Sequence, residues 1–114
     1  MERARHEFKD NYLPALAAVV ESALAKCGLS MDQIAFFDMM NANLRLQEFL
    51  LERLGFPLER SSADYLKRYG HFGSQDVFFN LDLAVKEGRI QKGDLVAMLT
   101  TGIGFSLVCA VVEY

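Results

Sequence analysis

Residues 34–40 read Ile-Ala-Phe-Phe-Asp-Met-Met, an apolar run that is broken by a single charged residue, Asp38. A short run of this kind, rich in Phe and Ile, is typical of a strand that is buried on both faces of a sheet. A carboxyl group inside such a strand requires a hydrogen-bonding partner, and the sequence does not name one. The stretch therefore predicts a fold built around one central, buried strand.

The residues that follow this strand predict a helix. Asn41 or Asn43 can cap it, because a side-chain amide oxygen accepts a hydrogen bond from an N–H of the first turn. Gly55 and Pro57 are expected to end it. The apolar positions of this segment recur at helical spacing: Leu46, Phe49, Leu50 and Leu54.

The segment before the strand predicts another helix. Apolar side chains recur at helical spacing from Leu13 to Cys27, and Gly28 supplies a stop. Pro14 fits the first turn of this helix, where its missing N–H costs nothing. Residues 1–10 are mostly polar or charged, and we expect them to form a separate turn or helix.

The C-terminal half continues the alternation of elements. Residues 59–69 are largely polar, with room for a short strand before Gly70. Three further elements are expected: a helix over 74–87, a strand over 95–99 and, after a glycine-containing turn at 102–104, a strand over 106–113. This order predicts one α/β domain over residues 1–114, with helices packed on a mixed sheet and a C-terminal antiparallel hairpin.

Composition excludes several classes of protein. The net charge of −3 argues against a nucleic-acid partner, which would require a basic patch. No apolar stretch is long enough to span a membrane, and a cytoplasmic protein is expected. Binding of an acidic carrier protein would require a local cluster of basic residues. The candidates for such a cluster, which can also be ordinary solvated residues, are Arg53, Arg60, Lys67 and Arg68.

The two cysteines do not predict a metal or redox centre. Neither Cys27 nor Cys109 has the spacing of a metal ligand, and no metal or cofactor is expected. Neither is expected at a helix N-terminus that would lower its pKa and activate it as a nucleophile. We expect both to be buried structural thiols.

Three segments carry a resemblance to one family. They are Met40-Asn41-Ala42-Asn43-Leu44-Arg45, Arg68-Tyr69-Gly70-His71-Phe72-Gly73-Ser74, and the stretch from Gly88-Arg89-Ile90-Gln91-Lys92-Gly93-Asp94 to Gly102-Ile103-Gly104-Phe105-Ser106. In this order and at these distances, they resemble the C-terminal domain of ketoacyl-ACP synthase III, a thiolase-like enzyme. The resemblance extends over most of the chain, from about Phe8 to Tyr114.

The resemblance implies an acyl-transfer chemistry. Family members take an acyl group from a thioester on a Cys of the N-terminal half, and a His and an Asn of the C-terminal half assist decarboxylation of malonyl-ACP. In this sequence Met40 stands at the family His position and His71 at the family Asn position. A thioether can neither donate a proton nor carry a positive charge, whereas imidazole can donate a hydrogen bond or act as a base. Decarboxylative condensation in the usual manner is therefore not expected.

Each candidate residue also has a structural explanation. His71 is a base or oxyanion donor for acyl transfer to an oxygen or nitrogen nucleophile, or a loop histidine. Asn43 positions the active-site loop or caps a helix. Gly70, Gly102 and Gly104 are expected to approach substrate, although Gly102 and Gly104 also suit a hairpin turn with positive φ.

Three functions remain open at this point. The first is the C-terminal segment of a synthase III-like acyltransferase, inactive alone because the nucleophile-bearing half is absent, and acting with acyl-CoA or acyl carrier protein. The second is a non-catalytic scaffolding subunit, which Met40 favours. The third is an unrelated small α/β ligand-binding module. A sheet edge or apolar patch is expected to be exposed, and to be covered by a complementary chain or by self-association.

Overall fold

The computed structural model describes residues 2–41, 43–102 and 106–114, with the side chains of residues 12–41, 43–101 and 106–114. Its helices are α1 (Glu2–Cys27), α2 (Leu44–Leu54), α3 (Ala63–Tyr69) and α4 (Asp76–Lys86), joined by 3₁₀ turns at Met31–Gln33 and Leu58–Arg60. Its strands are β1 (Phe36–Met39), β2 (Leu95–Gly102) and β3 (Ser106–Glu113).

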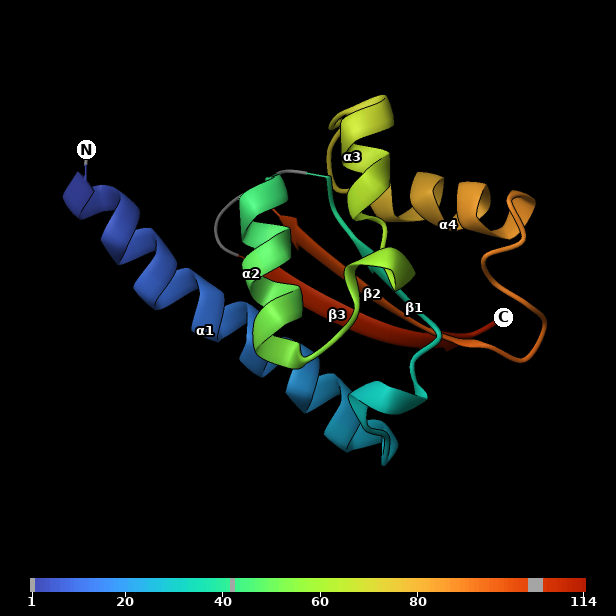
Figure 1. The fold of residues 1–114 in the computed structure, drawn as a ribbon. Coiled ribbons are helices and arrows are strands. Elements are labelled where there is room, and N and C mark those ends of the chain that lie inside the picture. The colour runs from blue at the N-terminus through green and yellow to red at the C-terminus, as the bar shows by residue number, and fades with distance from the viewer. Residues whose placement is uncertain (1, 42, 103–105) are drawn as a thin grey trace.

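The three strands form one mixed sheet in the order β1-β2-β3 (Figure 1). β1 pairs with β2 in parallel, with Asp38 opposite Met98, and β2 pairs with β3 in antiparallel. The predicted buried strand and C-terminal hairpin are thus confirmed. The hairpin turn itself falls at residues 103–105, outside the described residues.

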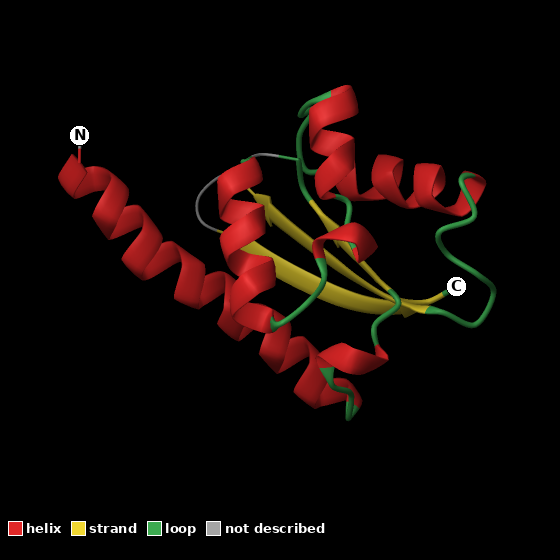
Figure 2. Ribbon diagram, in the orientation of Figure 1, coloured by secondary structure: helices red, strands yellow, loops and turns green. Residues whose placement is uncertain are grey.

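Helices cover both faces of the sheet, as Figure 2 shows. One core cluster joins α1 and α2 to β1 and β2 through residues such as Val20, Phe37 and Leu50. A second cluster joins α3 and α4 to the other face through Phe36 and Tyr65, among others. Alternate residues of β1 therefore enter opposite cores, which explains why the strand is apolar in sequence apart from Asp38.

Two predicted elements are wrong. Residues 2–27 form one continuous helix, with Pro14 inside it and not in its first turn. A proline there removes one backbone hydrogen bond, but burial of the apolar side of α1, including Leu16 and Val20, holds the helix on the sheet. The short strand expected within residues 59–69 is reduced to an isolated parallel bridge between Ser61 and Phe37. The rest of the segment forms a 3₁₀ turn and α3, because Ala63 and Tyr65 place a helical face in the core.

The two edges of the sheet differ. At the outer edge of β1, Ser62 N–H donates to the carbonyl of Phe37 over 3.0 Å, and Ser62 Oγ accepts from Met39 N–H over 2.8 Å. β3 is the other edge strand, and its exposed apolar residues include Val108 and Val112. The predicted exposed edge is therefore present, and it is β3. Among the described residues, no helix is both long and apolar enough to cross a membrane.

Candidate functional site

Two loops meet at the carboxyl end of β1. The first begins at Met40, whose backbone N–H donates to the carbonyl of Leu99 over 3.0 Å. The second contains His71 and precedes α4, and Ser74 Oγ ties it to β2 by donating to the carbonyl of Thr101 over 2.9 Å. The structure therefore brings together the two positions at which the sequence departs from the family pattern.

His71 is paired with a buried carboxylate that the sequence analysis did not single out. His71 Nδ1 lies 2.6 Å from Asp76 Oδ2, and the Asp76 side chain is 0 % exposed whereas that of His71 is 44 % exposed. Because the carboxylate accepts, the neutral imidazole carries its proton on Nδ1 and keeps the lone pair of Nε2. This arrangement is suited to a general base that takes a proton at Nε2.

Backbone donors hold Asp76 in place. Asn41 N–H donates to Asp76 Oδ2 over 2.9 Å, and Phe72 N–H donates to Asp76 Oδ1 over 2.9 Å. The first donor follows the Met40 position, and the second follows His71. A single carboxylate thus links both loops and orients the imidazole.

Behind Asp76 lies a network of fully buried polar side chains. Asn41 Nδ2 donates to Asn80 Oδ1 over 3.1 Å, and Asn80 Nδ2 donates back to Asn41 Oδ1 over 3.0 Å. Asn80 Nδ2 also donates to Asp38 Oδ1 over 3.1 Å and to the carbonyl of Met39 over 3.0 Å. This is the partner of Asp38 that the sequence could not name.

The two carboxyl groups of this network differ in their surroundings. Burial raises the pKa of Asp38 well above its usual value, the Asn80 hydrogen bond opposes the rise, and the negative charge of Asp76 adds to it. Asp76, in contrast, accepts two backbone N–H bonds beside an imidazole. Burial of Asp38 therefore disfavours its charged form, whereas the backbone donors around Asp76 match the two oxygens of a carboxylate.

Met40 lies beside a small cavity of about 50 Å³. The hydroxyls of Thr100 and Thr101 each lie 3.7 Å from its Sδ, which accepts weakly from them. Gln47 Nε2 donates to the carbonyl of Met40 over 2.8 Å, while the buried Gln47 Oε1 has no hydrogen-bond partner within the part of the chain that the structure describes. Met40 has no proton to donate in this environment, so the side chain that can transfer a proton in this site is the imidazole of His71.

The remaining predicted site residues have structural roles, and their contact with substrate stays a prediction. Asn43 caps α2, its Oδ1 accepting from Leu46 N–H over 3.1 Å. Gly70 ends α3 with φ of 76°, a conformation that favours glycine and turns the chain toward His71. Gly102 ends β2, and Gly104 lies outside the described residues.

Sequence reasoning missed Asp76, Asn80 and the side-chain role of Asn41. A usable signal was present, because Asp76, Asn80 and Ala84 recur every four residues and so share one face of the helix that follows the His71 loop. Polar residues in line with an apolar helix face indicate a buried polar contact rather than a solvated one.

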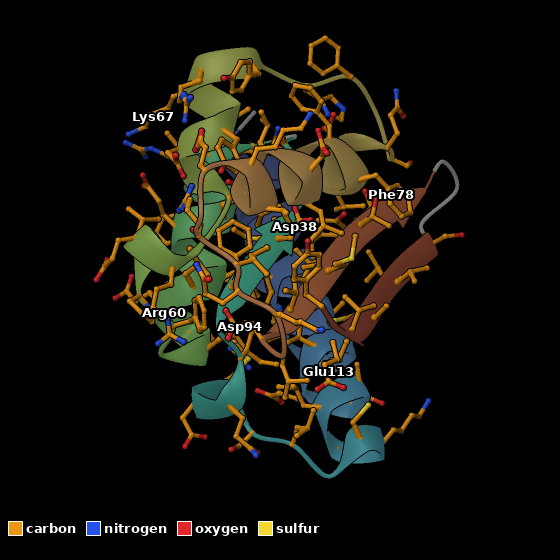
Figure 3. All side chains as sticks on the ribbon, turned by 90° about the vertical axis from the view of Figure 1, so that its right-hand side faces the viewer. Asp38, Arg60, Lys67, Phe78, Asp94 and Glu113 are labelled. Atoms are coloured by element: carbon orange, nitrogen blue, oxygen red, sulfur yellow. The ribbon has the colours of Figure 1, made fainter. Side chains whose placement is uncertain are left out.

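The candidate basic residues do not form one binding surface, and the possible metal ligands do not cluster among the described residues. Arg60 Nε donates to the carbonyl of Ala35 over 3.2 Å, and Arg68 pairs with Glu87 at 3.2 Å, so half of the candidate basic cluster is bound internally. Figure 3 shows Arg60 and Lys67 well apart on one side of the molecule. Within the described part of the chain, no three His, Cys, Asp or Glu residues are grouped to hold a metal.

The cysteines are only partly as expected. Both are free thiols, but Cys27 is exposed because it lies in the last turn of α1, where the chain leaves the sheet. Cys109 is half-buried in β3, and burial raises its pKa to about 11, with a smaller contribution from Cys27. The expectation that both are buried is therefore wrong for Cys27.

Comparison with known proteins identifies this architecture. The solved structure of beta-ketoacyl-[acyl carrier protein] synthase III from Thermus thermophilus superimposes with a TM-score of 0.85 at 32 % identity, over 96 % of this chain and 34 % of that one. The acyltransferase ChlB3 superimposes with a TM-score of 0.81 at 30 % identity, over 94 % of this chain and 32 % of that one. The fold is thus a thiolase-like α/β half-domain.

Sequence comparison gives the family. Residues 24–114 match the 3-oxoacyl-[acyl-carrier-protein (ACP)] synthase III C-terminal family. Beta-ketoacyl-[acyl-carrier-protein] synthase III of Xanthomonas campestris is 35 % identical over 100 residues, which are 88 % of this chain and 30 % of the relative. The chain therefore belongs to the 3-oxoacyl-ACP synthase III family and corresponds to its C-terminal domain, so an unrelated ligand-binding module is excluded. It spans about a third or less of the length of these relatives.

Proposed function

We propose that this chain supplies the C-terminal half of an acyltransferase site in which His71 acts as general base. The acyl group would come from a thioester and pass to an oxygen or nitrogen acceptor. The observation that carries the proposal is the 2.6 Å contact between His71 Nδ1 and the fully buried Asp76 Oδ2. A buried carboxylate fixes the tautomer and stabilises the imidazolium that forms when Nε2 takes a proton.

The residue at position 40 separates this proposal from decarboxylative condensation. Decarboxylation of a malonyl thioester develops negative charge on an oxygen, and donors aimed at that oxygen lower the barrier by about 3–4 kcal/mol each. The thioether of Met40 has no N–H or O–H and instead accepts weakly from two threonine hydroxyls. Proton transfer at His71 is the chemistry that these side chains support.

Acyl-CoA and acyl carrier protein are the proposed acyl donors, because the relatives are named for the carrier protein. The nucleophile would come from a complementary thiolase-like half. Association with that half or with a second copy is supported by the edge strand β3, which exposes Val108 and Val112. The cytoplasm, where acyl thioesters are used, is the proposed location.

A scaffolding role is the second candidate, and Met40 is the observation that favours it. A domain that had lost its catalytic function would tolerate a thioether at the family His position. The two candidates differ in what they require of Asp76, because a scaffold has no need to orient an imidazole that is nearly half exposed.

The test begins with native mass spectrometry of the material purified from its source, which identifies any chain associated with this one. The complete assembly is then given acetyl-CoA with water as the acyl acceptor, and the free CoA thiol that is released is measured. His71→Gln is expected to lower kcat/KM by about 10²–10⁴-fold, the usual contribution of a general base. Met40→Leu, the matched control, is expected to change it less than threefold.

Two results would reject the proposal. A large loss with Met40→Leu and none with His71→Gln would place the chemistry at position 40. No thiol release by an assembly that holds a reactive Cys would favour the scaffold.

A further inference from the structure

Asp38 has no part in the proton transfer described above, yet it is fully buried at the centre of the molecule. Figure 3 shows it on β1 beneath α4. Its Oδ1 accepts from Asn80 Nδ2 over 3.1 Å, and its buried Oδ2 has no hydrogen-bond partner among the described residues. An apolar residue would fill this strand position at lower cost, since a buried polar group with an unsatisfied oxygen is unfavourable by about 1–3 kcal/mol.

We propose that Asp38 and Asn80 are positioning residues for the His71–Asp76 pair, acting through Asn41. The use of the imidazole in acyl transfer rests on the proposed function. The orientation of His71 by this network does not, and it is tested separately below.

The hydrogen bonds form an unbroken chain from Asp38 to the imidazole. Three acceptors surround Asn80 Nδ2: Asp38 Oδ1, the Met39 carbonyl and Asn41 Oδ1. They fix which end of the Asn80 amide is the donor, so its oxygen faces Asn41 Nδ2. Held on both sides of its amide, Asn41 keeps its backbone N–H aimed at Asp76 Oδ2, the same oxygen that accepts from His71.

The charges around Asp38 are compatible with this role. Asp76 of α4 faces it as a carboxylate, His71 lies beyond Asp76 at the surface, and the β2 residue opposite, Met98, is uncharged. No described cation contacts Asp38, and its raised pKa favours its uncharged form. Asparagine is close to that form in shape and in hydrogen bonding.

The experiment measures the tautomer of neutral His71 by long-range ¹H–¹⁵N NMR on the whole chain, which has two histidines and so a simple spectrum. In the unaltered chain the Nδ1–H form is expected to dominate. Asp38→Leu removes one acceptor from Asn80 and is expected to lower the ratio of Nδ1–H to Nε2–H about fivefold, the effect of one net hydrogen bond. Asn80→Ala, which breaks the hydrogen-bonded network nearer to Asn41, is expected to lower the ratio of Nδ1–H to Nε2–H at least as much.

Two controls separate positioning from general loss of stability. Asp38→Asn keeps the acceptor and a neutral donor, and is expected to leave the tautomer ratio unchanged. Ser61→Ala removes a buried hydroxyl that bonds Leu58 and Ala63 outside the network, and is also expected to leave the ratio unchanged.

The proposal is overturned if Asp38→Leu and Asn80→Ala fold and retain the original ratio, or if Asp38→Asn shifts it as far as Asp38→Leu does. If Asp38→Leu does not fold, Asn80→Ala and Asp38→Asn still decide the matter. A ratio that responds as expected in an assembly that transfers no acyl group would reject the proposed function and leave the positioning role standing.

Discussion

Replacing Asp76 by asparagine is expected to destabilise the chain by about 1–4 kcal/mol. Asn keeps one acceptor oxygen, so its NH₂ group must face a backbone N–H, either that of Asn41 or that of Phe72, each 2.9 Å from the present carboxylate. One buried donor left unpaired costs about 1–3 kcal/mol. Loss of negative charge in the first turn of α4 adds about 0.3–1 kcal/mol.

The assay is urea unfolding followed by circular dichroism, with the free energy extrapolated to zero denaturant. Asp82→Asn is the matched control, because Asp82 lies on the same helix, is 59 % exposed and pairs with Lys86 at the surface. It is expected to change stability by no more than about 0.5 kcal/mol. A change below about 0.5 kcal/mol for Asp76→Asn as well would refute the conclusion that Asp76 joins the two loops.

Three further predictions follow from buried groups. Burial raises the pKa of Asp38 in the folded state, so above about pH 4 the unfolded chain ionises first, and Asp38 destabilises the fold increasingly until the pH passes the folded pKa. Asp38→Asn should therefore gain stability relative to the parent between pH 4 and pH 7 in urea titrations. The same difference in unfolding free energy between variant and parent at both pH values would contradict this. Arg89→Lys should cost about 1–3 kcal/mol in the same assay, because lysine cannot reproduce the fork that bonds Asp64 at 3.0 Å and the Ser61 carbonyl at 2.8 Å; exposed Arg53→Lys, the control, should cost under about 0.5 kcal/mol. Iodoacetamide at pH 8 should modify exposed Cys27 well before Cys109, whose pKa of about 11 leaves about one thiol in a thousand ionised. Equal rates of labelling of the two thiols, followed by intact-mass spectrometry, would show that β3 is not packed against α1.

The central strand could be predicted from sequence because both of its faces are buried. Phe36 enters the core beneath α3 and α4, and Phe37 enters the core beneath α1 and α2, so neighbouring positions of the strand are both apolar. The partner of Asp38 could not be predicted, since Asn80 lies 42 positions later and reaches it only when α4 packs on the sheet. Contacts of this kind depend on tertiary structure and leave only a weak local signal.

Local rules failed where packing outweighed them. Pro14 was expected to begin a helix, but α1 continues through it because its apolar side is buried on the sheet. The polar segment after Gly55 forms α3 for a similar reason, as Tyr65 is fully buried and needs a helical turn to reach the core.

The candidate site was predicted in part. Met40 and His71 were singled out by the resemblance of their motifs to the family pattern, and the structure brings their loops together. Asp76 did not follow, because its importance comes from three donors that converge on it from two loops. A carboxylate in the first turn of a helix has an ordinary local explanation. The spacing of Asp76, Asn80 and Ala84 indicates that this helix face is buried, but it does not say which groups Asp76 contacts.

The most direct test of His71 as the base compares two products of one reaction. The complete assembly is given acetyl-CoA and malonyl-ACP labelled in its free carboxyl group, and CO₂ release is measured against release of the CoA thiol. With His71 as base and a thioether at position 40, we predict thiol release without matching CO₂. One CO₂ for each thiol released would show that the site condenses as its relatives are named to do, and would contradict the central role of His71 and Asp76.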